Sequence, residues 1–139
     1  MKRISLIFLI FLPFILSAEN LPLEKFTEPA AHPRLIIRSD DIVKVRSAVQ
    51  SNPYMEKLDD FVLSMAAKYL DEPTVVRKKV GKRLLATSRT VLERVLYCSY
   101  AWMVTGDERY ARRAEEEMVA AAEFEDWNPS HFLDVAEMM

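Results

Sequence analysis

The chain has 139 residues, which is enough for one domain with a modest core, and its formal net charge is −2. This slight acidity argues against a nucleic-acid partner, because proteins that bind nucleic acids carry an excess of basic residues. Only two glycines and few β-branched runs indicate an all-α protein. The single cysteine, Cys98, excludes an internal disulfide and lies in an apolar run, where we expect it to be a small buried hydrophobe.

The first 18 residues have the pattern of a secretory signal peptide. Met-Lys-Arg opens the chain, residues 4–16 are almost wholly apolar, and Ser17-Ala18-Glu19 brings small and then polar residues. The apolar run is too short for a spanning helix, although an uncleaved anchor remains the alternative. Removal of residues 1–18 takes away two of 19 basic side chains and leaves 17 against 21 acidic ones, a net charge near −4. We expect an exported, periplasmic or secreted bacterial protein without stable membrane insertion.

Residues 19–38 contain Pro22, Pro29 and Pro33, and this spacing predicts an extended arm or linker. A helix is predicted to follow from Ser39-Asp40-Asp41, with Ser39 as N-cap and two acids at the positive end of the helix dipole.

Asn52-Pro53 ends this helix and begins the next, because Asn is a good N-cap and proline suits the first helical position. The apolar residues that follow have a helical period and predict one buried face. They are Tyr54, Leu58, Phe61, Val62, Met65 and Tyr69. Asp71-Glu72-Pro73 breaks the helix, and residues 74–82 are predicted to form a loop.

The basic residues of this loop region form a run that could contact an acidic glycan or simply face water. They are Arg77, Lys78, Lys79, Lys82 and Arg83.

Residues 88–105 form the most apolar predicted helix, which is therefore the central one, with Trp102 in the core. Gly106 suits the left-handed position after its end, and Asp107 suits the N-cap of a following helix. So short a connection predicts two antiparallel helices. In the second helix we expect Tyr110, Ala114, Met118, Ala121 and Ala122 on the buried face. The opposite, solvated face would hold Arg112, Arg113, Glu115, Glu116 and Glu117.

The last 14 residues predict a further helix, with Asn128 as N-cap and Pro129 at its first position. Phe132, Val135 and Met139 recur at helical spacing, and no glycine or basic residue closes the helix. This pattern is what we expect from the front part of a longer protein.

His131, Asp134 and Glu137 are three residues apart and would share one face of that helix. With Trp127 and Asn128 they are the candidate substrate-binding residues: the face would line a sugar cleft and Trp127 would stack on a sugar ring. The structural alternatives are a His131 held by a local carboxylate, an Asn128 that only caps, and a Trp127 in the core. A metal site would need further ligands, so we predict no metal and no cofactor.

Three segments together carry a resemblance. They are His32-Pro33-Arg34-Leu35-Ile36-Ile37, Thr105-Gly106-Asp107-Glu108-Arg109-Tyr110 and the block from Trp127 to Asp134. In this order and spacing the chain resembles the N-terminal part of heparinase II/III-like polysaccharide lyases, which are similar to alginate and chondroitin AC lyases. The resemblance implies that residues 39–139 are the first portion of an incomplete (α/α) toroid, truncated at the C-terminus.

The resemblance also implies an activity, namely cleavage of uronic-acid-containing glycans by β-elimination. Such lyases neutralise the uronate carboxylate and move protons with Tyr and His groups, which by the resemblance lie downstream of Met139. We therefore assign no catalytic residue to this chain and expect the fragment to be inactive alone, with an acidic polysaccharide as partner of the full-length protein. The alternatives are a secreted helical-hairpin module that binds proteins and a glycan-binding remnant without catalysis.

Overall fold

The computed structural model describes residues 36–139. The predicted signal peptide, residues 1–18, and all but the last three residues of the predicted arm, 19–38, lie outside the described residues. Ile36, at the start of the described part, is exposed.

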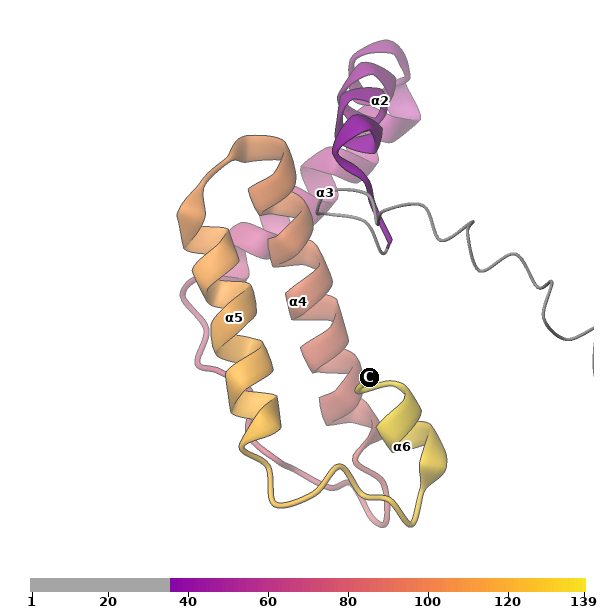
Figure 1. Cartoon of the computed structure of the whole chain (residues 1–139), viewed down its shortest axis with the longest axis vertical. Helices are drawn as coiled ribbons and strands as arrows, with labels where there is room; N and C mark the ends of the chain where they lie inside the picture. Colours follow the sequence, from indigo (N-terminus) through magenta and orange to yellow (C-terminus); the bar gives the residue numbers. More distant parts are fainter. Residues whose placement is uncertain (1–35) are drawn as a thin grey trace, which may run out of the picture. The chain divides into compact units, whose positions relative to one another are not determined.

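The described residues form five helices and no strand (Figure 1). They are α2 (Ser39–Ser51), α3 (Pro53–Tyr69), α4 (Leu85–Thr105), α5 (Glu108–Ala122) and α6 (Phe132–Ala136). Residues 71–84, between α3 and α4, contain only an isolated bridge from Val80 to Arg83. The all-α prediction is confirmed for this part of the chain. None of these helices is both long and apolar enough to cross a membrane.

The first two helices begin with capping bonds close to the predicted positions. Helix α2 has Arg38 as N-cap, one residue before the expected Ser39, and the Arg38 N–H donates to the Asp41 carboxylate at 3.1 Å. At α3 the prediction is confirmed: the Asn52 side-chain oxygen accepts the Tyr54 N–H at 2.9 Å, and Pro53 is the first helical residue.

Helices α4 and α5 form the predicted antiparallel hairpin (Figure 1). Gly106 has a φ of 76°, and its N–H donates to the Trp102 carbonyl at 2.7 Å. Asp107 accepts the Arg109 N–H at 3.0 Å and begins α5. Helix α4 contacts each of the other described helices, as expected for a central helix. A small core cluster forms around it from Ala66, Tyr69, Cys98, Ala101 and Ala114.

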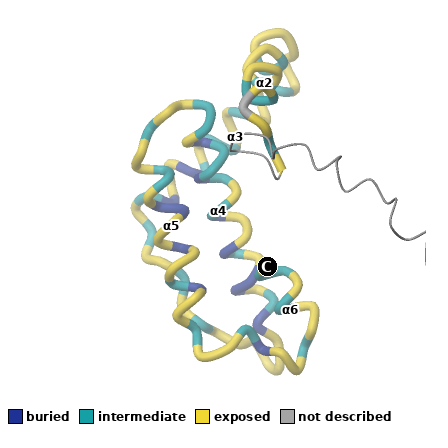
Figure 2. Tube along the Cα trace, in the orientation of Figure 1, coloured by how far each residue is buried: buried dark blue, intermediate teal, exposed yellow. Residues whose placement is uncertain are grey.

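The predicted apolar faces are only partly covered, and Figure 2 shows exposed positions along every described helix. On α3, Tyr69 is buried, but Tyr54 is 83% exposed and Phe61 is 52% exposed. Trp102, expected in the core, is 42% exposed and donates to Glu108, and Met118 is half exposed. The helical period predicted the buried faces only in part: on α5, Ala114 and Ala121 are buried, but Met118 and Ala122 are exposed. It could not show that the other described helices cover only part of each face.

Two residues predicted to face water are instead buried together with Arg94. Arg113 is 6% exposed and Glu117 is fully buried. The Glu117 carboxylate accepts Nη1 of Arg94 at 2.8 Å and a second bond from Nη2 of Arg113. It also accepts the backbone N–H of Val75 at 3.1 Å. We call Arg94, Arg113 and Glu117 the buried ion cluster. Residues 114, 117 and 121 share one helical face, so the period itself placed Glu117 beside two buried alanines.

Arg94 extends this cluster to the segment that follows α3. Its guanidinium donates to the Pro73 carbonyl at 2.8 Å and to the Glu72 carboxylate, and it lies 5.4 Å from the centre of the Tyr69 ring. The buried ion cluster therefore joins the α3–α4 connection to both helices of the hairpin. These contacts hold the connection in place although it has no regular secondary structure.

Replacement of Glu117 tests this cluster. Glu117→Ala leaves two largely buried guanidinium groups without their shared carboxylate, so we expect a loss of about 3–5 kcal/mol in the free energy of unfolding. The control is Glu115→Ala, an exposed neighbour on the same helix, for which we expect a change within about 0.5 kcal/mol. Urea unfolding followed by circular dichroism measures both. Equal midpoints for the two variants would show that the cluster does not hold the fold.

Candidate functional site

The segment after α5 departs from the predicted helix start. Asn128 is not an N-cap: it has a φ of 59°, is 2% exposed, and precedes a turn at Pro129-Ser130. Helix α6 begins only at Phe132, with His131 at its N-cap position, and spans five residues. The predicted helix start is therefore wrong. Asn tolerates the left-handed conformation, and here its side chain bonds to distant groups instead of the local backbone.

Those distant groups tie the segment to the start of α4. The Asn128 side-chain amide donates to the Lys82 carbonyl at 2.9 Å and to the Asp134 carboxylate at 2.5 Å. The same Asp134 oxygen accepts the backbone N–H of Leu84 at 2.8 Å, and the Asp134 carbonyl accepts the Ser88 hydroxyl at 2.9 Å. Leu84 is the N-cap residue of α4 and makes no side-chain capping bond. Asp134 therefore satisfies an amide at the start of a helix 50 residues earlier.

The hydrogen bonds around Asp134 also favour its charged form. Burial, the largest single effect, raises the pKa of this carboxyl, but the hydrogen bonds from Leu84 and Asn128 together with nearby positive charge outweigh it, so the pKa lies below its usual value. Glu137 is held separately: both of its oxygens accept from Arg89, at 3.0 and 3.2 Å, and the hydrogen bond from Arg89 lowers its pKa.

The remaining two candidate residues have different surroundings. Trp127 is half-buried, and its indole N–H donates to the Ala121 carbonyl at 2.8 Å, which fixes the segment against the end of α5. His131 is half-buried and lies outside the helix. The expected common helix face of His131, Asp134 and Glu137 is not formed, because Asp134 points inward and Glu137 pairs with α4. Substrate binding by the five candidate residues stays a prediction.

The basic run lies in a loop, as expected, but its members differ. Arg77 pairs with Glu125 at 3.0 Å and with Asp126 at 2.6 Å, and its hydrogen bond is the main reason that the pKa of Asp126 is lowered. Lys78, Lys79, Lys82 and Arg83 are exposed. Arg77 therefore anchors the loop to the segment after α5, while the others present charge at the surface.

Two tyrosines that could serve in proton transfer are engaged as hydrogen-bond donors. Tyr69 donates to Glu93 and Tyr100 donates to Asp59. Burial, followed by these carboxylate partners, raises the pKa of both phenols well above its ordinary value. Neither phenol is poised as a base near neutral pH. Burial likewise raises the pKa of the Cys98 thiol, which makes it a poor nucleophile.

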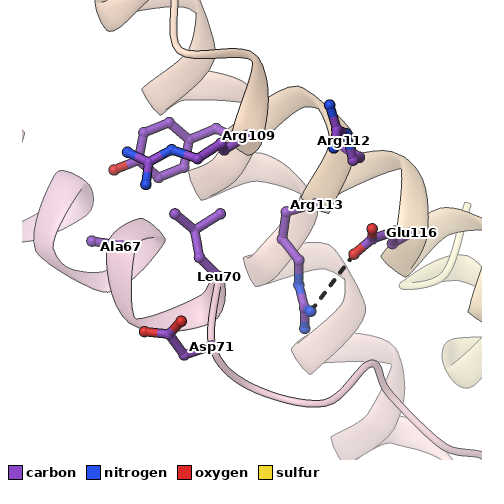
Figure 3. Close-up of a pocket in the computed structure, with 8 residues that line it drawn as sticks. Ala67, Leu70, Asp71, Arg109, Arg112, Arg113 and Glu116 are labelled. Atoms are coloured by element: carbon purple, nitrogen blue, oxygen red, sulfur yellow. Dashed lines mark ion pairs between the residues drawn. The ribbon is translucent and has the colours of Figure 1, made fainter.

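A pocket rich in arginine lies between the end of α3 and the first half of α5 (Figure 3). Its volume is about 440 Å³. Helix α5 contributes Arg109, Tyr110, Arg112, Arg113 and Glu116, and the end of α3 contributes Ala67, Leu70 and Asp71. The sequence placed Arg112 and Arg113 on a solvated face and gave no sign that residues 67–71 would lie beside them. We call this the arginine pocket.

Among the described residues, no group of three or more His, Cys, Asp or Glu side chains is arranged to hold a metal ion. Comparison with models of known protein families gives no match for the chain. No curated protein matches it in sequence either.

The charge on Asp134 gives a testable pH dependence. A carboxyl whose pKa is lowered by folding stabilises the fold above its unfolded value, here 3.8, and this contribution is lost as the pH falls through the folded pKa. We expect Asp134→Asn to melt below the wild type at pH 7, with the gap narrowing below about pH 4. Asp60→Asn, at an exposed position on α3, is the control. A gap that stays constant from pH 7 to pH 3 would exclude this role of the charge.

Proposed function

We propose that this chain is the N-terminal part of an exported heparinase II/III-like polysaccharide lyase, and that residues 39–139 belong to the wall of an incomplete (α/α) toroid. The three sequence segments described above support this assignment. So does the order of the helices, in which short connections join α2 to α3 and α4 to α5. The proposed substrate is a uronic-acid-containing glycan.

One structural observation carries the proposal further than the motifs do: large apolar side chains remain exposed on three successive helices. They are Tyr54, Leu58, Phe61, Leu92, Leu96, Trp102, Met118 and Val119. Apolar faces of this extent are typical of surfaces that pack against another element. In a toroid, each hairpin packs against its neighbours, so a wall segment has such faces on its flanks.

The chemistry of the described residues favours a non-catalytic role for this region in the proposed elimination reaction. β-Elimination removes the proton at C5 of the uronate and expels the sugar linked at O4, so it needs a base and a proton donor near each other. Tyr69 and Tyr100 are committed to carboxylates and have raised pKa values. In the proposed assignment, this region contributes structure and substrate contacts, and the proton-transfer groups lie on the later helices of the toroid.

A second function remains open, because the same exposed apolar residues would suit a secreted module that binds another protein. The two proposals differ in ligand. A lyase wall is expected to bind an acidic glycan. A protein-binding module is not expected to bind acidic polysaccharides in preference to neutral ones.

Affinity electrophoresis of the full chain tests the proposed substrate class. We expect migration of the chain to be retarded in at least one of three gels, which contain alginate, chondroitin or heparan. We expect it to be unchanged in a gel that contains neutral dextran. We also expect no ultraviolet absorbance of unsaturated uronate after incubation with these polymers, because Tyr69 and Tyr100 are committed to carboxylates and the proposal places the proton-transfer groups elsewhere. Unchanged migration in all three uronate gels would reject glycan binding, and released unsaturated uronate would reject the absence of catalysis.

The exposed apolar faces predict self-association of the chain in isolation. We expect Leu58→Glu/Phe61→Glu to shift sedimentation velocity profiles toward monomer, because two charges replace apolar contacts on α3. Ser47→Glu/Ser64→Glu adds the same charge at exposed polar positions and is the matched control. A wild-type chain that sediments as monomer over the same concentrations would argue against an uncovered toroid flank.

A further inference from the structure

The arginine pocket lies beside the buried ion cluster and shares Arg113 with it. Arg109, Arg112 and Arg113 line the pocket together with Asp71 and Glu116, so the lining has three positive and two negative side chains. In Figure 3, the Leu70 side chain lies between those of Arg109 and Arg113. The pocket lining therefore combines arginine side chains with the apolar surface of Ala67 and Leu70.

The first two arginines are accessible. Arg112 is exposed and forms no ion pair with a carboxylate of the described residues. Arg109 pairs with Asp107 at 2.6 Å, but its side chain remains 70% exposed. An exposed ion pair of this kind contributes little to stability, and its guanidinium can form further bonds.

Arg113 is the observation that points to an anion. It is 6% exposed, and its main partner, Glu117, is shared with Arg94. A second carboxylate, that of Glu116, has an oxygen 3.9 Å from Nη1 of Arg113. The Nε–H of Arg113 is buried without a hydrogen-bond partner in the described structure. A buried guanidinium is normally paired and hydrogen-bonded. The Arg113 Nε–H is thus a buried hydrogen-bond donor without an acceptor among the described residues, on a side chain that lines the pocket.

The other lining groups complete the chemistry of an acidic sugar. Arginine binds a carboxylate through parallel hydrogen bonds. Asp71 and Glu116 accept hydrogen bonds from hydroxyl groups, and Ala67 and Leu70 offer apolar contact to the C–H face of a ring. The volume, about 440 Å³, lies within the usual range of about 300–1,000 Å³ for small-molecule sites.

We propose that the arginine pocket binds the carboxylate of a uronate residue within an acidic glycan. The inference rests on the proposed function and deepens it, because it assigns a substrate contact to α3 and α5 and not to the segment after α5. Arg109 and Arg112 bind the carboxylate directly. Arg113 is a positioning residue. It is held by Glu117 and adds positive electrostatic potential at the buried wall of the pocket.

The test compares two double variants of the full chain. Arg109→Gln/Arg112→Gln removes two charges from the pocket but keeps the Asp107 cap, which uses the backbone N–H of Arg109. Lys79→Gln/Arg83→Gln removes two exposed charges from the basic loop. Affinity electrophoresis in alginate, which carries uronate without sulfate, gives dissociation constants for each. Dextran sulfate, which carries sulfate without uronate, separates the two kinds of anion. Circular dichroism melts confirm that both variants fold.

We expect the pocket variant to bind alginate about tenfold more weakly or worse, and the loop variant to bind within about twofold of the wild type. Binding of the wild type to dextran sulfate alone would overturn the assignment of a uronate. Equal alginate binding by the wild type and the pocket variant would reject the pocket and leave the proposed function standing. No binding of the wild type to any uronate polymer would reject both.

Discussion

The buried carboxylate of Glu117 joins α4, α5 and the connection that follows α3. It is fully buried between Arg94 and Arg113 and also accepts the Val75 amide. Burial of one carboxylate is tolerated because two guanidinium groups and a backbone N–H meet it, whereas any one of these charges alone would be costly to bury. The same bonds fix the α3–α4 connection and hold Arg113 at the wall of the arginine pocket. Stability and the proposed site therefore share one carboxylate.

A second polar contact fixes the other end of the hairpin. Asp134 accepts from Asn128 and from the Leu84 amide, so the segment after α5 closes over the start of α4. Both contacts supplement a core built largely from small side chains such as Ala66, Cys98 and Ala101. Because small residues bury little apolar area, hydrogen-bonded carboxylates take a larger part in defining how these helices pack.

The structural roles of the carboxylates and tyrosines bear on the proposed function. Asp134 and Glu137 are engaged in holding the fold, and Tyr69 and Tyr100 are engaged with carboxylates. Accessible cations remain on the surface, among them Arg109 and Arg112 on α5 and the basic residues of the loop. Such groups bind anions and do not transfer protons at neutral pH, because guanidinium stays protonated. A wall segment that contacts an acidic glycan without eliminating it is consistent with this distribution.

The sequence by itself determined helices α2 to α5, the Asn52-Pro53 junction, the Gly106-Asp107 turn and the central place of α4, but not where α6 begins. Each of these follows from rules that act over a few residues, such as capping, a left-handed glycine and the helical period. Only the tertiary structure decided the role of Asn128, which bonds to Lys82 and Asp134 in place of capping a helix, and the burial of Arg113 and Glu117. It also decided how much of the α3 face is covered. These outcomes depend on groups up to 50 residues apart, whose meeting is set by helix packing, and no local pattern records which side chains will face one another.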